Sequence, residues 1–164
     1  MGTPFTQVYN RFLGKITDDM YMELTPEDTV RDLRNLLIDA IPGFEFPRKN
    51  LLDYTIVDAE NALEEESSFA ADLSSEEINI LAILMMVSWT QRQITSIENT
   101  RMKYSSSDFK FTSQANHLAK LLTLLRETQR QSHHMQRLYK RRRTDESGTY
   151  ESNWSVLRDT SALN

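Results

Sequence analysis

Residues 74–97, SSEEINILAILMMVSWTQRQITSI, decide the fold. Ser74 and Glu77 have the spacing of a capping box, in which each side chain accepts a hydrogen bond from the backbone N–H of the other residue. Behind this box, apolar residues occupy almost every side of a helix as far as Trp89. A helix that is apolar all round is buried by other elements. We therefore expect a central core helix over about residues 75–98, which becomes one-sided beyond Trp89.

Two shorter helices are predicted before the core helix. Residues 3–15 place apolar side chains at helical spacing. Residues 25–41 begin with a capping threonine, Thr25, and a proline at the first helical position, Pro26. Pro42-Gly43 stops this helix.

Residues 44–73 have no clear period and predict a short strand or an extended wrap. The acidic stretch 58–66 is compatible with a brief exposed helical turn.

A second long helix is predicted after a break at residues 100–112. Ser105-Ser106-Ser107-Asp108 favours a turn, and Phe109-Lys110-Phe111 alternates as a short strand does. The helix then begins near residue 113 and runs to Arg143, over about 45 Å. Its first half carries four leucines, whereas its second half is mostly polar. We expect the first half to pack on the core helix and the second half to project toward another chain, with a solvated, frayed helix end as the alternative.

The predicted fold class is therefore mainly α. It is a small helical bundle with a long C-terminal helix, a short β-like loop segment and an extended C-terminal tail. The helical domain covers residues 1–143, with core helices at about 25–41, 75–98 and 113–143. The polar tail covers residues 144–164, and we expect it to become ordered only on a partner.

The 164-residue chain has a net charge of −5, which conceals a division along the sequence. Residues 1–72 carry −9, residues 73–143 carry +7, and residues 144–164 carry −3. This pattern indicates charge complementarity, either between faces of one monomer or between copies. No apolar run reaches the roughly 18–20 residues of a membrane span, so no membrane association is predicted.

The sequence does not predict an enzyme. Zero cysteines exclude disulfides, thiolate zinc sites and cysteine nucleophiles. The three histidines, His117, His133 and His134, lack a carboxylate or histidine at the spacing of helical metal pairs. No phosphate-cradling glycine-rich loop or nucleophile elbow is present. We therefore expect no catalytic, cofactor-binding or metal-binding residue, and no cofactor.

The clearest local feature is a basic cluster, Arg137 to Arg143, at the predicted end of the long helix. Five cations in seven residues are able to neutralise nucleic-acid phosphates, with Tyr139 to stack or anchor. They are equally able to dock on an acidic protein surface, or to form a solvated helix end that the helix dipole favours. All three interpretations stay open. The candidate partner-binding residues, including isolated apolar positions of the tail, are Arg137, Tyr139, Lys140, Arg141, Arg142, Arg143, Tyr150, Trp154 and Leu157.

Several stretches resemble a known family of small structural proteins. They are Phe44-Glu45-Phe46-Pro47-Arg48 with Asn50-Leu51 and Asp53-Tyr54, Glu76-Glu77-Ile78 with Ile80-Leu81-Ala82 and Leu84-Met85, Ile97-Glu98-Asn99-Thr100-Arg101, Ser107 to Ala115, His117-Leu118, and Arg137-Leu138-Tyr139-Lys140-Arg141-Arg142. In this order they resemble the neck, or head–tail adaptor, proteins of tailed bacteriophages. The resemblance covers roughly residues 5–143.

The resemblance implies a helical subunit of a homo-oligomeric ring, commonly of twelve copies, in the neck of the virion at the portal vertex. It implies contacts with the portal protein on one side and with a stopper or tail-completion protein on the other. Genomic DNA would pass through the lumen without sequence-specific binding, and the subunit would be in the host cytoplasm during assembly. The alternative function is an intracellular nucleic-acid-binding helical protein that uses the cluster 137–143.

Overall fold

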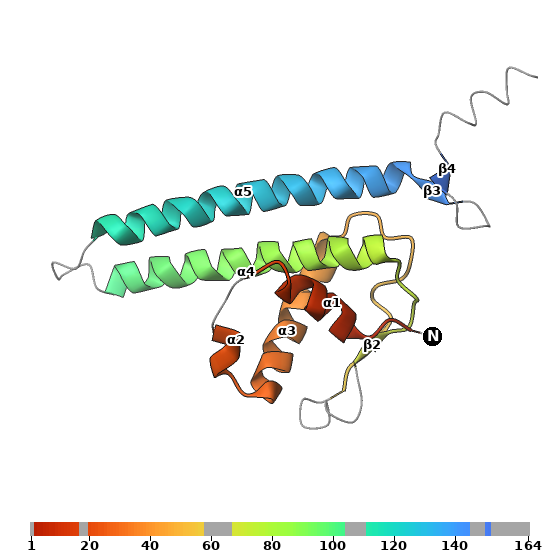
Figure 1. Ribbon diagram of the computed structural model, residues 1–164, viewed down its shortest axis with the longest axis horizontal. Helices are drawn as coiled ribbons and strands as arrows, with labels where there is room; N and C mark the ends of the chain where they lie inside the picture. The colour runs from red at the N-terminus through yellow and green to blue at the C-terminus, as the bar shows by residue number, and fades with distance from the viewer. Residues whose placement is uncertain (1, 17–19, 58–66, 104–110, 145–149, 152–164) are drawn as a thin grey trace, which may run out of the picture.

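The computed structural model describes residues 2–16, 20–57, 67–103, 111–144 and 150–151, and the fold is mainly α (Figure 1). The helices are α1 (Phe5–Leu13), α2 (Met20–Glu23), α3 (Pro26–Ala40), the 3-10 helix η1 (Ile41–Gly43), α4 (Ser75–Lys103) and α5 (Phe111–Arg141). The strands are β1 (Tyr54–Thr55), β2 (Ser68–Phe69), β3 (Arg143–Thr144) and β4 (Tyr150–Glu151).

The predicted helix starts are confirmed by their capping hydrogen bonds. The Thr25 hydroxyl accepts from the backbone N–H of Asp28 at 3.2 Å, one turn into α3. Before α4, the Glu77 carboxylate accepts from the N–H of Ser74 at 2.8 Å, and the Ser74 hydroxyl accepts from the N–H of Glu77 at 3.3 Å. Both helices therefore begin where short-range side-chain chemistry places them.

The break after the core helix is shorter than predicted. Residues 100–103 belong to α4, and Phe111 is the first residue of α5 rather than part of a strand. Phe109 and Lys110 lie outside the described residues.

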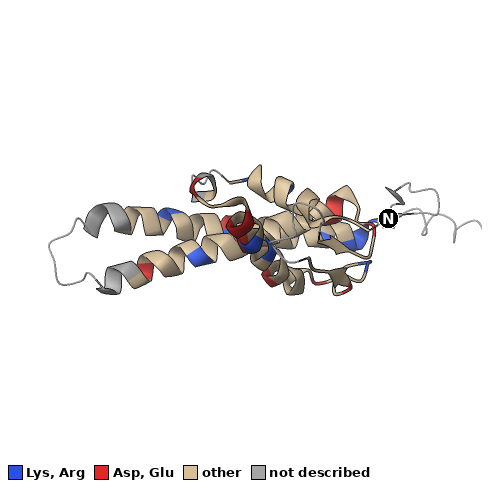
Figure 2. Cartoon of the chain, turned by 90° about the horizontal axis from the view of Figure 1, so that it is seen from below, with Lys and Arg blue, Asp and Glu red and all other residues tan. Residues whose placement is uncertain are grey.

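Helix α4 is the central layer of the molecule. Helix α5 runs antiparallel along one side of it, and α1 and α3 pack against its other side (Figure 1). The main core lies where these elements meet, around Ile80, Leu81 and Met85 of α4, which are completely buried. Farther along the pair, α4 and α5 extend beyond the part of the molecule where the other helices gather (Figure 2). A second, smaller core of Ile94, Leu121 and Leu125 lies between them there.

The N-terminal residues attach the two-stranded sheet of β1 and β2 to the start of α4. Strands β1 and β2 are antiparallel, and Pro4 bridges to Ser68. The Thr3 hydroxyl accepts a hydrogen bond from the backbone N–H of Leu73 at 2.6 Å, directly before α4. Gly2 passes so close to β2 that an added Cβ would lie 2.0 Å from the Phe69 carbonyl oxygen. The expectation of a short strand within residues 44–73 is confirmed, whereas residues 58–66 lie outside the described residues.

The second half of α5 is not placed as predicted. The polar second half does not project, because Tyr139 is 1% exposed and belongs to the main core. Three polar residues of this half, Thr128, Ser132 and Gln136, are also buried. The leucine-rich first half packs on α4, as expected, but it does so in the part of the pair that extends away from the main core.

No helix within the described ranges is both long enough and apolar enough to cross a membrane.

Candidate functional site: the outer face of α5

Tyr139, a predicted partner-binding residue, lies inside the molecule. Its hydroxyl donates to Glu77 Oε1 at 2.5 Å and accepts from the backbone N–H of Arg48 at 3.1 Å. The Arg48 guanidinium lies 4.4 Å from the centre of the Tyr139 ring. The rings of Phe44 and Tyr139 pack against each other edge to face. Burial, followed by the hydrogen bond to Glu77, raises the pKa of the Tyr139 hydroxyl well above its usual range. The expectation that this ring is available to a partner is therefore wrong, and the residue closes the core instead.

Gln136 explains why the polar half of α5 is buried. Its side-chain oxygen accepts from the backbone N–H of Glu45 at 2.8 Å, and its amide group donates to the Gly43 carbonyl at 3.1 Å and to Ser132 Oγ at 3.1 Å. Two of these bonds satisfy partly buried backbone groups at the end of η1 and in the loop that follows it. The loop therefore covers the second half of α5, and polar side chains are required there.

Other members of the predicted cluster make contacts with residues of the same chain. Arg142 Nη1 lies 2.9 Å from Glu76 Oε1. The Lys140 ammonium lies 3.9 Å from the centre of the Phe46 ring, and Arg48 donates to the Arg142 carbonyl. These contacts hold the end of α5 against the loop at residues 44–48.

The remaining predicted residues lie in or beyond the hairpin of β3 and β4. Arg143 is in β3 and pairs with Glu151 of β4, and Thr144 pairs with Tyr150. Trp154 and Leu157 lie outside the described residues. Of the tail 144–164, Thr144, Tyr150 and Glu151 are thus paired within the single chain.

Exposed cations form a line along α5 that is longer than the predicted cluster. Arg126, Arg130, Arg137 and Arg141 fall within about 60° of one another around the helix axis and extend over about 22 Å. This direction is opposite the buried stripe of α5. We call the exposed cations the α5 basic face, which consists of Lys120, Arg126, Arg130, Arg137, Lys140 and Arg141.

Three of these residues, Lys120, Arg126 and Arg130, were not predicted as site residues. For Arg126 and Arg130 the signal was their spacing, four residues from each other and seven residues from Arg130 to Arg137, which places these cations on one side of a helix. Lys120 has no such spacing to a later cation of the face. The predicted cluster 137–143 instead consists of residues adjacent in sequence, which point in different directions around a helix.

The α5 basic face carries little opposing charge. Within the described part of the chain, none of its six cations forms an ion pair, and Glu127 is the only acidic residue of α5. The face therefore presents a positive potential to solvent, which attracts anionic surfaces and loses strength with salt.

No catalytic or metal-binding constellation is evident in the residues that the structure describes. They contain no group of three histidine, aspartate or glutamate residues that is able to hold a metal ion. His133 Nδ1 lies 3.4 Å from Glu45 Oε1 on the surface, and His117 and His134 are exposed.

Comparisons with protein-family models, with curated proteins and with solved structures find no match to this chain.

Proposed function

We propose that this protein is a non-enzymatic structural adaptor in the neck of a tailed-phage virion, where copies form a ring between the portal protein and a stopper or tail-completion protein. The proposal starts from the sequence resemblance over residues 5–143. The observation that carries it structurally is the α5 basic face, six exposed cations along a helix that extends beyond the main core.

The opposite charge is available on the same chain. The front segment, residues 1–72, has a net charge of −9, and in it α2 and α3 expose acidic residues such as Glu23 and Glu27. Helix α3 packs on the side of α4 that faces away from α5 (Figure 1). Opposite charges on two sides of one subunit favour head-to-tail contacts between identical copies, which close into a ring when the rotation permits.

Electron microscopy of the protein mixed with a candidate portal protein tests this function. We expect a ring bound at one end of the portal. The double variant Arg130→Gln/Arg137→Gln removes two central cations of the α5 basic face and is expected to lose ring formation while keeping its thermal unfolding temperature. The matched control is Arg31→Gln/Lys49→Gln, which removes the same charge from exposed positions elsewhere.

The proposal fails if the wild-type protein forms no ring with or without portal. The role assigned to the α5 basic face fails if the control variant loses assembly to the same extent as the test variant.

A second candidate function, nucleic-acid binding, is favoured by the same face, because its cations are unpaired among the described residues and span several phosphate spacings. A mobility-shift titration with double-stranded DNA at two salt concentrations separates the candidates. DNA binding predicts an affinity that falls steeply with salt, with a slope reduced by about 2 in Arg130→Gln/Arg137→Gln. Absence of binding at low salt excludes this function and leaves the adaptor role intact.

A further inference from the structure

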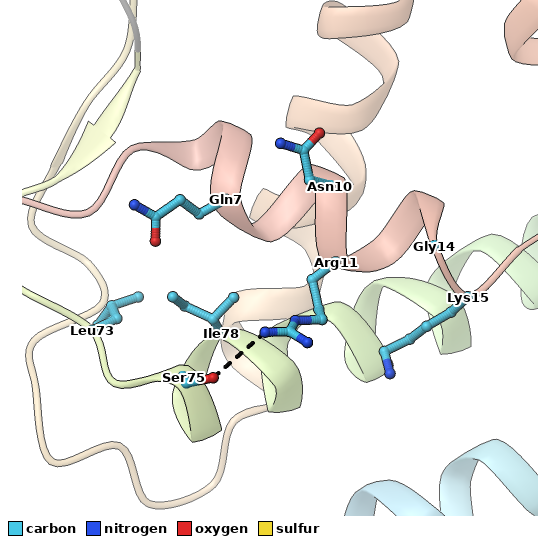
Figure 3. Close-up of a pocket in the computed structure, with 8 residues that line it drawn as sticks. All are labelled: Gln7, Asn10, Arg11, Gly14, Lys15, Leu73, Ser75 and Ile78. Atoms are coloured by element: carbon cyan, nitrogen blue, oxygen red, sulfur yellow. Dashed lines mark hydrogen bonds between the residues drawn. The ribbon is translucent and has the colours of Figure 1, made fainter.

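A groove opens between α1 and the start of α4 (Figure 3). Its volume is about 740 Å³, which is far larger than a single small ion needs. The residues that line it come from α1 and the turn after it, and from the first residues of α4 and the segment before them. They are Gln7, Asn10, Arg11, Gly14, Lys15, Leu73, Ser75 and Ile78.

The described residues of this lining carry only positive charge. Among them are Arg11 and Lys15 and no carboxylate. Arg11 reaches toward α4 from α1 and Lys15 from the turn after it, and Arg11 Nη2 lies 3.5 Å from Ser75 Oγ (Figure 3). None of the ion pairs found within the described ranges involves either cation.

The two acidic residues in the first turn of α4 do not neutralise the groove. Glu76 is paired with Arg142 at 2.9 Å. Glu77 is 3% exposed and accepts hydrogen bonds from Tyr139 and Ser74. Partial burial, and then the charge of Arg11, lower the pKa of the Lys15 ammonium. An anion placed between the two cations would relieve this repulsion.

The walls of the groove are fixed before any ligand arrives. Phe5, Val8 and Phe12 anchor α1 in the main core, and the capping box fixes the start of α4. The floor is apolar, because Leu73 and Ile78 lie there and are each 7% exposed. A preformed groove with an apolar floor and two cations at one side avoids much of the ordering cost of binding.

We propose that this groove binds an acidic peptide segment of a partner protein, with a carboxylate between Arg11 and Lys15 and an aliphatic side chain over Leu73 and Ile78. The size of the groove and its apolar floor favour a peptide over a free anion, and the positive charge of Arg11 and Lys15, which form no ion pair among the described residues, selects carboxylates. The site uses α1 and the start of α4, so it is independent of the function proposed for the α5 basic face.

Fluorescence polarisation with a labelled peptide of two glutamates, a leucine and two glutamates tests this site on the full chain. We expect saturable binding that the double variant Arg11→Gln/Lys15→Gln weakens by about tenfold or more, since it removes both charged partners of the carboxylate. The matched control, Arg31→Gln/Lys49→Gln, removes the same charge from exposed positions outside the groove and outside the α5 basic face, and is expected to change the affinity by less than about twofold. A peptide with glutamine in place of glutamate is expected not to bind.

A second measurement uses only the wild-type protein, so it does not depend on whether the variants fold. Bound peptide is expected to protect Lys15, but not Lys49 or Lys120, from acetylation, as read by peptide mass mapping. Equal weakening in both double variants, equal protection of all three lysines, or absence of binding at about 1 mM peptide overturns the proposal. Full displacement of the peptide by an equal concentration of inorganic phosphate would identify a free-anion site instead and would also overturn it.

Discussion

The antiparallel helices α4 and α5 are packed differently at the two ends of the pair. At the near end, residues 75–90 of α4 and 128–141 of α5, the helices belong to the main core, where Leu81 is completely buried and Tyr139 is 1% exposed. At the far end, residues 91–103 and 111–125, the described buried residues of α4 and α5 form the small core of Ile94, Leu121 and Leu125. Among the described residues, the near end therefore carries most of the packing.

This difference shows that apolar content does not by itself set burial. The far end of α5 is rich in leucine, yet Leu122 is 36% exposed there. The near end is polar, yet Gln136 is 3% exposed because a distant loop covers it. What decides burial is the presence of a third element against the pair.

The largest expected effect is on the free energy of unfolding, when one leucine in each of the two cores is replaced by alanine. Leu81→Ala at the near end should lower the free energy of unfolding by about 3–5 kcal/mol, because the surrounding helices cannot collapse into the space. Leu125→Ala at the far end should lower it by about 1–2 kcal/mol, because that side chain has fewer neighbours and retains some solvent contact. Urea unfolding followed by circular dichroism measures both. Equal losses would show that the two ends are equally packed.

A smaller effect is expected for the tyrosine hydroxyl that closes the near end. Tyr139→Phe should lower the free energy of unfolding by about 1–3 kcal/mol, because Glu77 loses a donor and the N–H of Arg48 loses an acceptor. Tyr9→Phe is the matched control, since the Tyr9 hydroxyl is buried without a hydrogen-bond partner among the described residues. This control should leave stability unchanged within about 0.5 kcal/mol or increase it. A comparable loss in both variants would contradict the assigned role of the Tyr139 hydroxyl.

The smallest effect at neutral pH concerns the ionisation of the same two tyrosines, both of which belong to the main core. Burial raises the pKa of Tyr9 and of Tyr139 in the folded protein. Their contribution to stability is therefore complete below the ordinary tyrosine pKa of about 10 and is lost as the pH rises from there toward the folded value.

The free energy of unfolding should consequently fall above about pH 10, and less steeply in Tyr9→Phe/Tyr139→Phe. Urea unfolding at several alkaline pH values measures the slopes, and tyrosinate absorbance follows the ionisation itself. Identical slopes in the wild-type protein and the double variant would refute the linkage.

Local chemistry made much of the fold predictable. The starts of α3 and α4 depend on contacts between residues three apart, so Thr25 and Ser74 are recognisable from the sequence. The core role of α4 follows from its apolar composition. The arrangement of α5 was not predictable in this way, because Gln136 and Tyr139 find their partners in residues 43–48, more than 90 residues earlier.

The candidate site was likewise predictable only where it depends on residues close together in sequence. The cations of the α5 basic face follow helical spacing, and the sequence alone contains that signal. The position of Tyr139 depends on Glu77 and Arg48, which no local pattern connects to it. The groove at Arg11 and Lys15 likewise requires α1 to lie against the start of α4, a contact between segments about 65 residues apart.

Tyr139 is also, among the described residues, the last one along the chain that belongs to the main core. During synthesis, α1, α3 and α4 emerge first, and Glu77 and Arg48 have no tyrosine hydroxyl to bind until α5 has been made. Contacts between residues so distant in sequence form late and slow the folding of a small domain. The core of this domain therefore stays open on the side of α4 that α5 later covers, and truncation before Tyr139 would leave that side open for the lifetime of the chain.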